Sequence, residues 1–196
     1  MNIRPNVINA MKVSITLLSY DHGILRQVLD VYKDIVEKGS IEKNRQIATE
    51  GVEFLMMFMD HFHHGKEERF LFPAAICADP EHTGDLQQLF EDHRTARMLA
   101  EEMLTAVRPG GDDAKFTESA GKLVVHMTEH IRKEEDTIFP GIDAQMDEKE
   151  DLRVYKHFED FTMNNFKEDV YPAAEAFASR FQDVVLGAGY FDNKNK

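Results

Sequence analysis

The feature that most constrains this chain is an internal repeat of eleven residues. Residues 63–73 read HHGKEERFLFP, and residues 130–140 read HIRKEEDTIFP. At a constant offset six of the eleven positions are identical, where chance would give on the order of one. The identities are His63/His130, Lys66/Lys133, Glu67/Glu134, Glu68/Glu135, Phe72/Phe139 and Pro73/Pro140. The chain is therefore expected to fold as two similar halves.

A shorter motif precedes each copy of the repeat. Residues 21–26 and residues 92–97 both read D-H-x-x-x-R. Each half therefore reads D-H-x-x-x-R followed by H-x-x-x-E-E-x-x-x-F-P. Two helical hairpins packed about an approximate twofold axis form a four-helix bundle.

Apolar residues recur at helical spacing through most of the chain, and no segment alternates as a strand would. We expect an all-α protein: an up-down-up-down four-helix bundle with two additional C-terminal helices. Helix 2 is expected to kink or break at Gly65 and Pro73, and helix 4 to end before Pro140. Asp147 to Glu150 reads as a capping box that opens helix 5. The expected organisation is a bundle over residues 14–140, a C-terminal helical extension over 147–187, and termini at 1–13 and 188–196.

Composition excludes several classes of function. The formal net charge is −13 and the pI is near 5.1, so tracking of nucleic-acid phosphates and anchoring to an anionic membrane are not expected. Cys77 is the only cysteine, which rules out an internal disulfide framework and fits a reducing compartment. No apolar run approaches the roughly 20 residues of a membrane span, and the start lacks a signal-peptide pattern. We expect a soluble cytoplasmic protein, and the sequence leaves its oligomeric state open.

The spacing of histidine and glutamate in the repeat indicates metal ligands. His63 and Glu67 are four residues apart and project from one helix face, as do His130 and Glu134. With the histidines of the two D-H motifs, four imidazoles and two carboxylates would meet in the bundle core. Burial of so many titratable groups without a partner is costly, and a metal supplies the partner. Imidazole with carboxylate and no thiolate suits iron or manganese.

These motifs, in this order, resemble those of the hemerythrin-like, HHE cation-binding family. That family has a histidine on helix 1, H-x-x-x-E on helix 2, a histidine on helix 3 and H-x-x-x-E on helix 4, and the resemblance covers roughly residues 14–140. It implies two iron ions in a non-heme centre, with two bridging carboxylates and a bridging oxo or hydroxo group. Manganese or another divalent metal is the alternative. The ligands implied by position are His22, His63, Glu67, His93, His130 and Glu134.

The chain departs from the oxygen-carrying hemerythrins at two positions. They place a second histidine one turn after the first on helix 3, where this chain has Arg97. They use an aspartate five residues after the helix-4 histidine, where this chain has Glu135, with Glu134 competing at spacing four. Four histidines, two bridging glutamates and one oxygen bridge would leave two coordination positions open on a pair of six-coordinate ions.

A fifth histidine could fill one of these positions. His126 lies one turn before His130, and its repeat partner is Met59, so His126 breaks the symmetry as a fifth ligand would. His64 is the alternative, since it is adjacent to His63 and about 100° around the helix.

Charged residues beside the ligands are candidates for orienting or neutralising the site. Surface ion pairs are the competing interpretation. These candidates, together with His64, are Asp21, Arg26, Asp92, Arg97, Glu68 and Glu135.

The leading hypothesis for function is a di-iron protein that binds or senses O₂ or a related small molecule such as NO or peroxide. The second is an enzyme with the same metals, either a catalase-like peroxide scavenger or a ferroxidase. Two open coordination positions would favour turnover, so ligation by His126 discriminates between the two, and whether the protein is an enzyme stays open. A third hypothesis is iron handling or sensing, in which metal occupancy controls stability.

Overall fold

The computed structural model describes residues 11–166 and 170–190, which are helical with short connections and contain no strand. The segments η1, η2 and η4 are π-helices, and η3 is a 3₁₀-helix. In chain order the elements are α1 (Val13–Glu37), α2 (Ile41–Phe54), η1 (Leu55–His64), η2 (Glu67–Leu71), α3 (Phe72–Ala78), η3 (Pro80–His82), α4 (Thr83–Val107), α5 (Asp113–Lys133), η4 (Glu134–Ile138), α6 (Phe139–Gln145), α7 (Glu148–Asn165) and α8 (Val170–Leu186).

Two of the bundle helices are composite. Helix 2 runs without a break from residue 41 to 78 through α2, η1, η2 and α3, and helix 4 runs from 113 to 145 through α5, η4 and α6. The structure therefore excludes a break at Gly65 and Pro73, which was one of the two expectations there, the other being a kink, and the expected end of helix 4 before Pro140 is wrong. Proline lacks the N–H that an α-helix needs and clashes with the carbonyl four residues earlier. A π turn precedes each proline. In a π turn a carbonyl pairs with the N–H five residues later. The carbonyl four residues before the proline therefore pairs with the residue after the proline, and the missing proline N–H is not needed.

Helix ends follow the local signals of the sequence. The side chain of Asp112 accepts hydrogen bonds from the backbone N–H groups of residues 114 and 115, and the side chain of Asp147 accepts one from residue 150. Gly39 and Gly110 adopt positive φ values of 57° and 77° in the turns that follow helices 1 and 3. These turns reverse the chain, so consecutive bundle helices are antiparallel.

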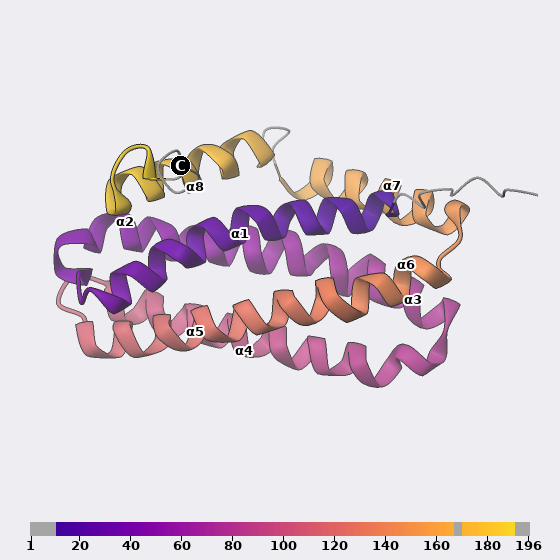
Figure 1. Cartoon of the computed structure of the whole chain (residues 1–196), viewed down its shortest axis with the longest axis horizontal. Helices are drawn as coiled ribbons and strands as arrows, with labels where there is room; N and C mark the ends of the chain where they lie inside the picture. The colour runs from indigo at the N-terminus through magenta and orange to yellow at the C-terminus, as the bar shows by residue number, and fades with distance from the viewer. Residues whose placement is uncertain (1–10, 167–169, 191–196) are drawn as a thin grey trace, which may run out of the picture.

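The four bundle helices lie side by side along the long axis of the molecule, and α7 and α8 cover one side of the bundle (Figure 1). The predicted all-α, four-helix bundle with two additional C-terminal helices is confirmed. Within the described residues no helix is long and apolar enough to cross a membrane. Residues 1–10 and 191–196 of the predicted termini lie outside the described residues.

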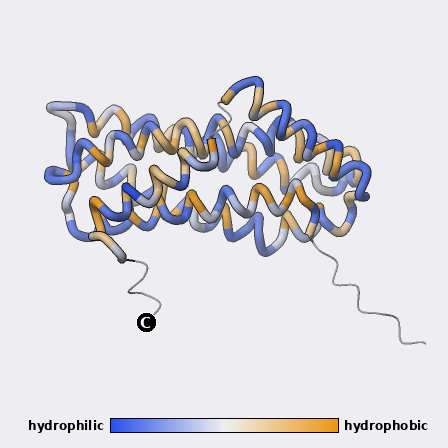
Figure 2. Tube along the Cα trace, turned by 90° about the horizontal axis from the view of Figure 1, so that it is seen from above, coloured by the Kyte–Doolittle hydropathy of each residue, from blue (hydrophilic) through white to orange (hydrophobic). Residues whose placement is uncertain are grey.

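The apolar core consists of two clusters that follow one another along the bundle. Apolar and polar stretches alternate along every helix, as amphipathic packing requires (Figure 2). Helix α1 passes from Leu18 in the smaller cluster to Leu25 in the larger one, and α4 passes from Leu89 to Ala96 in the same sense. The segment of each helix between the two clusters carries the polar residues of the candidate site.

Helix α8 is anchored to the first hairpin by a close contact. The ring of Tyr32 meets that of Phe181 at 5.2 Å between centroids, and the Tyr32 hydroxyl donates a hydrogen bond to the carbonyl of Ala48 at 2.8 Å. Gly51 makes room for both rings, because a Cβ at this position would lie 3.0 Å from the Phe181 ring. The extension therefore packs as part of the same core.

Candidate metal centre

The imidazoles and carboxylates of the repeat meet between the two apolar clusters. His22 comes from α1 and His93 from α4. His63 and Glu67 come from the π-helical η1 and η2 of helix 2, whereas His130 lies in the last turn of α5 and Glu134 begins the π-helical η4 of helix 4. We call these six residues the inner cluster. Each of its members is at most 3% exposed: His22, His63, Glu67, His93, His130 and Glu134.

The inner cluster divides into two overlapping sets of donor atoms. Within each set, one nitrogen or oxygen per residue lies within 4.8 Å of the others. The sets share both glutamates, so each carboxylate stands between the two histidine pairs. One set is His22, His63, Glu67 and Glu134, and the other is His93, His130, Glu67 and Glu134.

In the first set the two imidazoles approach each other closely at their nitrogens. The Nε2 atoms of His22 and His63 are 3.1 Å apart, and His22 Nε2 is also 3.1 Å from Glu134 Oε2. His63 Nε2 lies 3.6 Å from Glu67 Oε2. Both imidazoles therefore turn Nε2 toward the shared carboxylates.

The second set repeats this arrangement across the approximate twofold axis. His93 Nε2 is 3.4 Å from Glu67 Oε2, and His130 Nε2 is 3.3 Å from Glu134 Oε1. His93 Nε2 is also 4.0 Å from Glu134 Oε1. Glu67 thus faces one histidine of each set, and Glu134 faces histidines of both.

The repeated phenylalanine of each H-x-x-x-E-E-x-x-x-F-P motif covers an inner histidine. Phe139 lies parallel to the ring of His22 at 5.5 Å between centroids, and Phe72 lies near-parallel to the ring of His93 at 5.8 Å. Both phenylalanines are fully buried. They close the smaller-cluster end of the centre against water.

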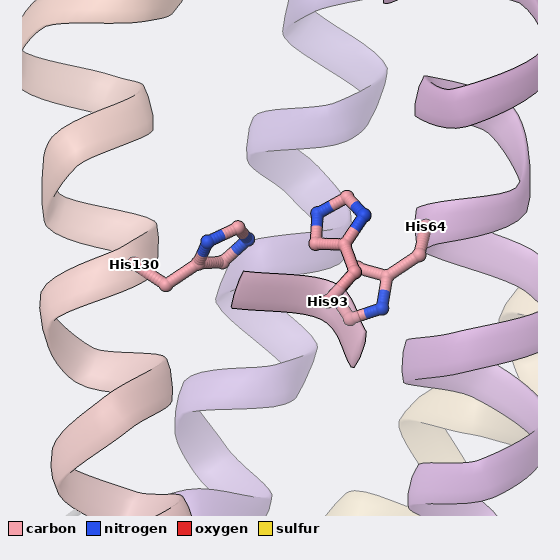
Figure 3. Close-up of side chains that lie close together, drawn as sticks. All are labelled: His64, His93 and His130. Atoms are coloured by element: carbon pink, nitrogen blue, oxygen red, sulfur yellow. The ribbon is translucent and has the colours of Figure 1, made fainter. Parts of the chain in front are cut away.

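A fifth imidazole, that of His64, joins the second set. His64 is fully buried, and one of its nitrogens lies within 4.8 Å of nitrogens of His93 and His130. Figure 3 shows the three side chains converging from helices 2, 3 and 4. Neighbouring residues differ by about 100° around a helix. Since helix 2 contacts both α1 and α4, His63 faces His22 while His64 faces His93.

The structure does not bring His126 to the inner cluster. Its Nε2 lies 2.8 Å from the backbone carbonyl of Asp92, at the partly exposed seam between α4 and α5. The expectation that His126 fills an open position therefore does not fit the geometry, and His64 is the residue placed to do so. Sequence pattern did not separate the two, because both have an apolar repeat partner: Met59 for His126 and Ile131 for His64.

An outer carboxylate faces the Nδ1 atom of each inner histidine, and three of the four lie within hydrogen-bonding distance. Such contacts fix the ring orientation and direct Nε2 inward. The second glutamate of each motif crosses to a histidine of another helix, and each D-H aspartate faces the first histidine of the following H-x-x-x-E motif. The Nδ1–oxygen distances are 3.0 Å for His22–Glu135, 2.8 Å for His93–Glu68, 3.1 Å for His63–Asp21 and 3.8 Å for His130–Asp92.

The two arginines of the D-H-x-x-x-R motifs bind these carboxylates and do not reach the inner cluster. Arg26 pairs with Glu135, and Arg97 lies 3.8 Å from Glu68. Arg97 also donates to both carboxylate oxygens of Asp60, at 2.8 and 2.9 Å. Sequence analysis missed Asp60, which lies 3.9 Å from His64. Its spacing of four residues from His64 is the signal that could have identified it.

Neighbouring groups outweigh burial at two members of the inner cluster: the carboxylates of Glu134 and Glu135 raise the pKa of His22, and neighbouring imidazoles lower that of Glu134. At Glu67 and at the adjacent histidines of helix 2 burial dominates. It raises the pKa of Glu67 well above the usual range, and the nearby carboxylate of Glu134 adds to that rise. It also lowers the pKa of His63 and of His64 well below the usual range. Neutral imidazoles are the form that coordinates metal. A cation would in turn favour ionised glutamates.

The inner cluster contains buried polar atoms that no hydrogen bond satisfies within the described residues. They include both carboxylate oxygens of Glu67 and the Nε2 atoms of His93 and His130. Buried polar groups are normally paired, and each unpaired one costs on the order of 1–3 kcal/mol. Cation binding would satisfy these atoms together, so the donor set fits a metal.

A surface cleft of about 570 Å³ between helix 2, α4 and α7 reaches the outer carboxylates. Asp60, Glu68 and Arg97 form part of its wall. Asp60 lies 3.9 Å from His64, and Glu68 binds His93. On the His63 side the corresponding carboxylate, that of Asp21, is fully buried. Solvent therefore approaches the second set more closely than the first.

The whole inner cluster lies within the part of the chain that matches a known protein family. The model of the hemerythrin HHE cation-binding domain matches residues 13–142, which include every member of the inner cluster. No curated protein and no solved structure matches the chain.

Proposed function

Because the chain belongs to the hemerythrin HHE cation-binding family, we propose that the inner cluster holds two iron ions and that this centre binds or senses O₂ or a related small molecule. The observation that carries the proposal is the sharing of Glu67 and Glu134 between two sets of donor atoms. Carboxylates with two oxygens suit the bridging of neighbouring cations. Imidazole and carboxylate donors without thiolate suit iron, with manganese as the alternative.

The number of histidines supports binding of a small molecule at one ion. The second set with His64 offers three imidazoles, whereas the first set offers two. If two six-coordinate ions shared both glutamates and one oxygen bridge, a single coordination position would stay open, on the ion held by His22 and His63. A di-iron pair supplies the electrons for O₂ chemistry when it is present. The protein's own contribution is to orient the imidazoles through their Nδ1 partners and to exclude water with the flanking apolar clusters.

Metal content and absorption test the proposal. The protein loaded anaerobically with Fe²⁺ is expected to bind two ions per chain and to develop ligand-to-iron charge-transfer bands on exposure to O₂ or NO. The variant His63→Ala should lose one ion, while His61→Ala, whose side chain is 69% exposed, should behave as the wild type. Binding of fewer than two ions by the wild type, or no charge-transfer bands, would contradict the proposal.

Turnover is the second candidate, and a direct assay separates it from binding. Two open positions would favour peroxide decay or ferroxidase activity, whereas His64 as a ligand leaves one. Steady-state decay of hydrogen peroxide with the iron-loaded protein should therefore be slow, and should accelerate in His64→Gln. Rapid decay by the wild type would move the proposal to a catalase-like enzyme.

A further inference from the structure

The two lysines of the repeat occupy different environments. Lys66 and Lys133 occupy the same position of the repeated motif. Lys66 is nevertheless only 1% exposed, whereas Lys133 is half-buried. Lys133 forms no hydrogen bond or ion pair within the described part of the chain. The approximate twofold symmetry of the bundle therefore breaks at this position.

The C-terminal helices create the environment of Lys66. Its ammonium donates to the carboxylate of Asp21 and, at 3.2 Å, to the hydroxyl of Tyr171 on α8. It also lies 4.1 Å from the ring centroid of Phe62 and 5.6 Å from that of Phe158 on α7. Hydrogen bonds and aromatic faces together offset the cost of burying an ammonium group. Tyr171 and Phe158 both lie outside the matched family domain, residues 13–142.

The two halves of the centre differ in the contact between the aspartate of the D-H motif and its histidine. Asp21 binds Lys66, is fully buried, and lies 3.1 Å from Nδ1 of His63. Its repeat counterpart Asp92 is 19% exposed at the side chain and lies 3.8 Å from Nδ1 of His130. The aspartate thus reaches hydrogen-bonding distance of its imidazole only where a buried lysine holds it.

We propose that Lys66 and Tyr171 are positioning residues through which the C-terminal helices fix His63, by way of Asp21. The cation position formed by His22 and His63 then depends on the extension through Lys66, whereas no buried lysine among the described residues links the extension to the position formed by His64, His93 and His130. The inference rests on the proposed metal centre for its metal readout, and it assigns a role to Tyr171, which lies outside the matched family domain.

Two measurements on Lys66→Met test the proposal. In the metal-free protein, side-chain ¹⁵N NMR should show His63 changing from a single Nδ1–H tautomer to a mixture, with His130 unchanged. In anaerobic titration with Fe²⁺, one of two equivalents should weaken by about 10–100-fold, the range found for outer partners of metal ligands. Tyr171→Phe should change both readouts in the same direction by a smaller factor, because it removes only one contact of the ammonium.

Lys133→Met is the matched control, since it removes the identical residue of the other half. It should leave the His63 tautomer and both Fe²⁺ equivalents as in the wild type. Equal effects of the two lysine substitutions, or no effect of either, would overturn the proposal. If Lys66→Met does not fold, Tyr171→Phe decides the question, and an unchanged His63 signal in that variant counts against the proposal.

The two readouts also separate this inference from the proposed function. A wild-type protein that takes up no Fe²⁺ would contradict the metal centre, while the NMR comparison in the metal-free protein would still decide whether Lys66 positions His63. A protein that binds two ions equally well in every variant, with an unchanged His63 tautomer, would retain the centre and overturn the role of the extension.

Discussion

The imidazole of His64 lies flat against that of His93, with ring centroids 3.7 Å apart and planes inclined by 9°. Two charged rings would repel at this separation. Burial lowers the pKa of both rings, and in His64 the proximity of His93 lowers it further. These shifts favour a pair of neutral imidazoles, which can direct nitrogen lone pairs toward His130 and the shared glutamates.

His64 is expected to contribute to metal affinity and His126 is not. The substitution His64→Gln should weaken binding of one Fe²⁺ equivalent at least tenfold, because it removes one of three imidazoles from the second set. The matched substitution His126→Gln should change affinity less than twofold. Anaerobic titration with Fe²⁺ measures both. A larger loss of affinity in His126→Gln than in His64→Gln would contradict this expectation, and would show that metal binding moves His126 away from the carbonyl of Asp92 and into the centre.

Metal removal should destabilise the protein. The unpaired oxygens of Glu67 and the Nε2 atoms of His93 and His130 carry a burial cost that a cation relieves. At free metal 100 times the dissociation constant, one site should raise the free energy of unfolding by about 2.7 kcal/mol. Urea unfolding with Fe²⁺ and with a chelator gives the difference. Identical curves would argue against a cation in the inner cluster.

Acid should weaken the metal-free protein partly through Glu135. The hydrogen bond from His22, with that from Arg26, lowers the pKa of Glu135 from 4.5 to about 2. Because the folded-state pKa lies below the unfolded value, this contribution to stability is complete above pH 4.5 and disappears as the pH falls toward 2. Glu135→Gln should flatten the dependence of unfolding free energy on pH between these values.

The exposed residue Glu148 provides the comparison for that pH series. Glu148→Gln should keep the wild-type slope between pH 5 and pH 2. If Glu135→Gln keeps that slope as well, the His22–Glu135 contact does not contribute to stability in solution.

Two helical glycines should respond oppositely to alanine. A Cβ at Gly51 would meet the hydroxyl of Tyr32 and the ring of Phe181, so Gly51→Ala should destabilise the protein by about 1–3 kcal/mol. A Cβ at Gly121 would lie 3.7 Å from Val36, an ordinary contact, and alanine favours a helix by up to about 1 kcal/mol over glycine. Gly121→Ala should therefore be neutral or stabilising. Thermal unfolding of the two variants checks both signs.

Much of the bundle and of the inner cluster could be predicted because the signals are local and repeated. Helical periodicity determines which face of a helix is buried, and a spacing of four places His63 with Glu67 and His130 with Glu134. Duplication of the motif then places two such faces opposite each other. Helix ends at prolines were predicted less well. The rule that proline ends a helix assumes α-helical hydrogen bonding, and the turns before Pro73 and Pro140 are π-helical instead.

The amino-acid sequence by itself determined the helices, their pairing into two similar halves and the residue types that face inward. Only the tertiary structure decided which rival histidine reaches the centre and which lysine of the repeat is buried. The reason is that periodicity reports whether a side chain points inward, whereas the neighbouring helix decides what it meets there. His64 meets His93, and His126 meets a backbone carbonyl. Lys66 is buried because α7 and α8 pack over one half of a nearly symmetric bundle.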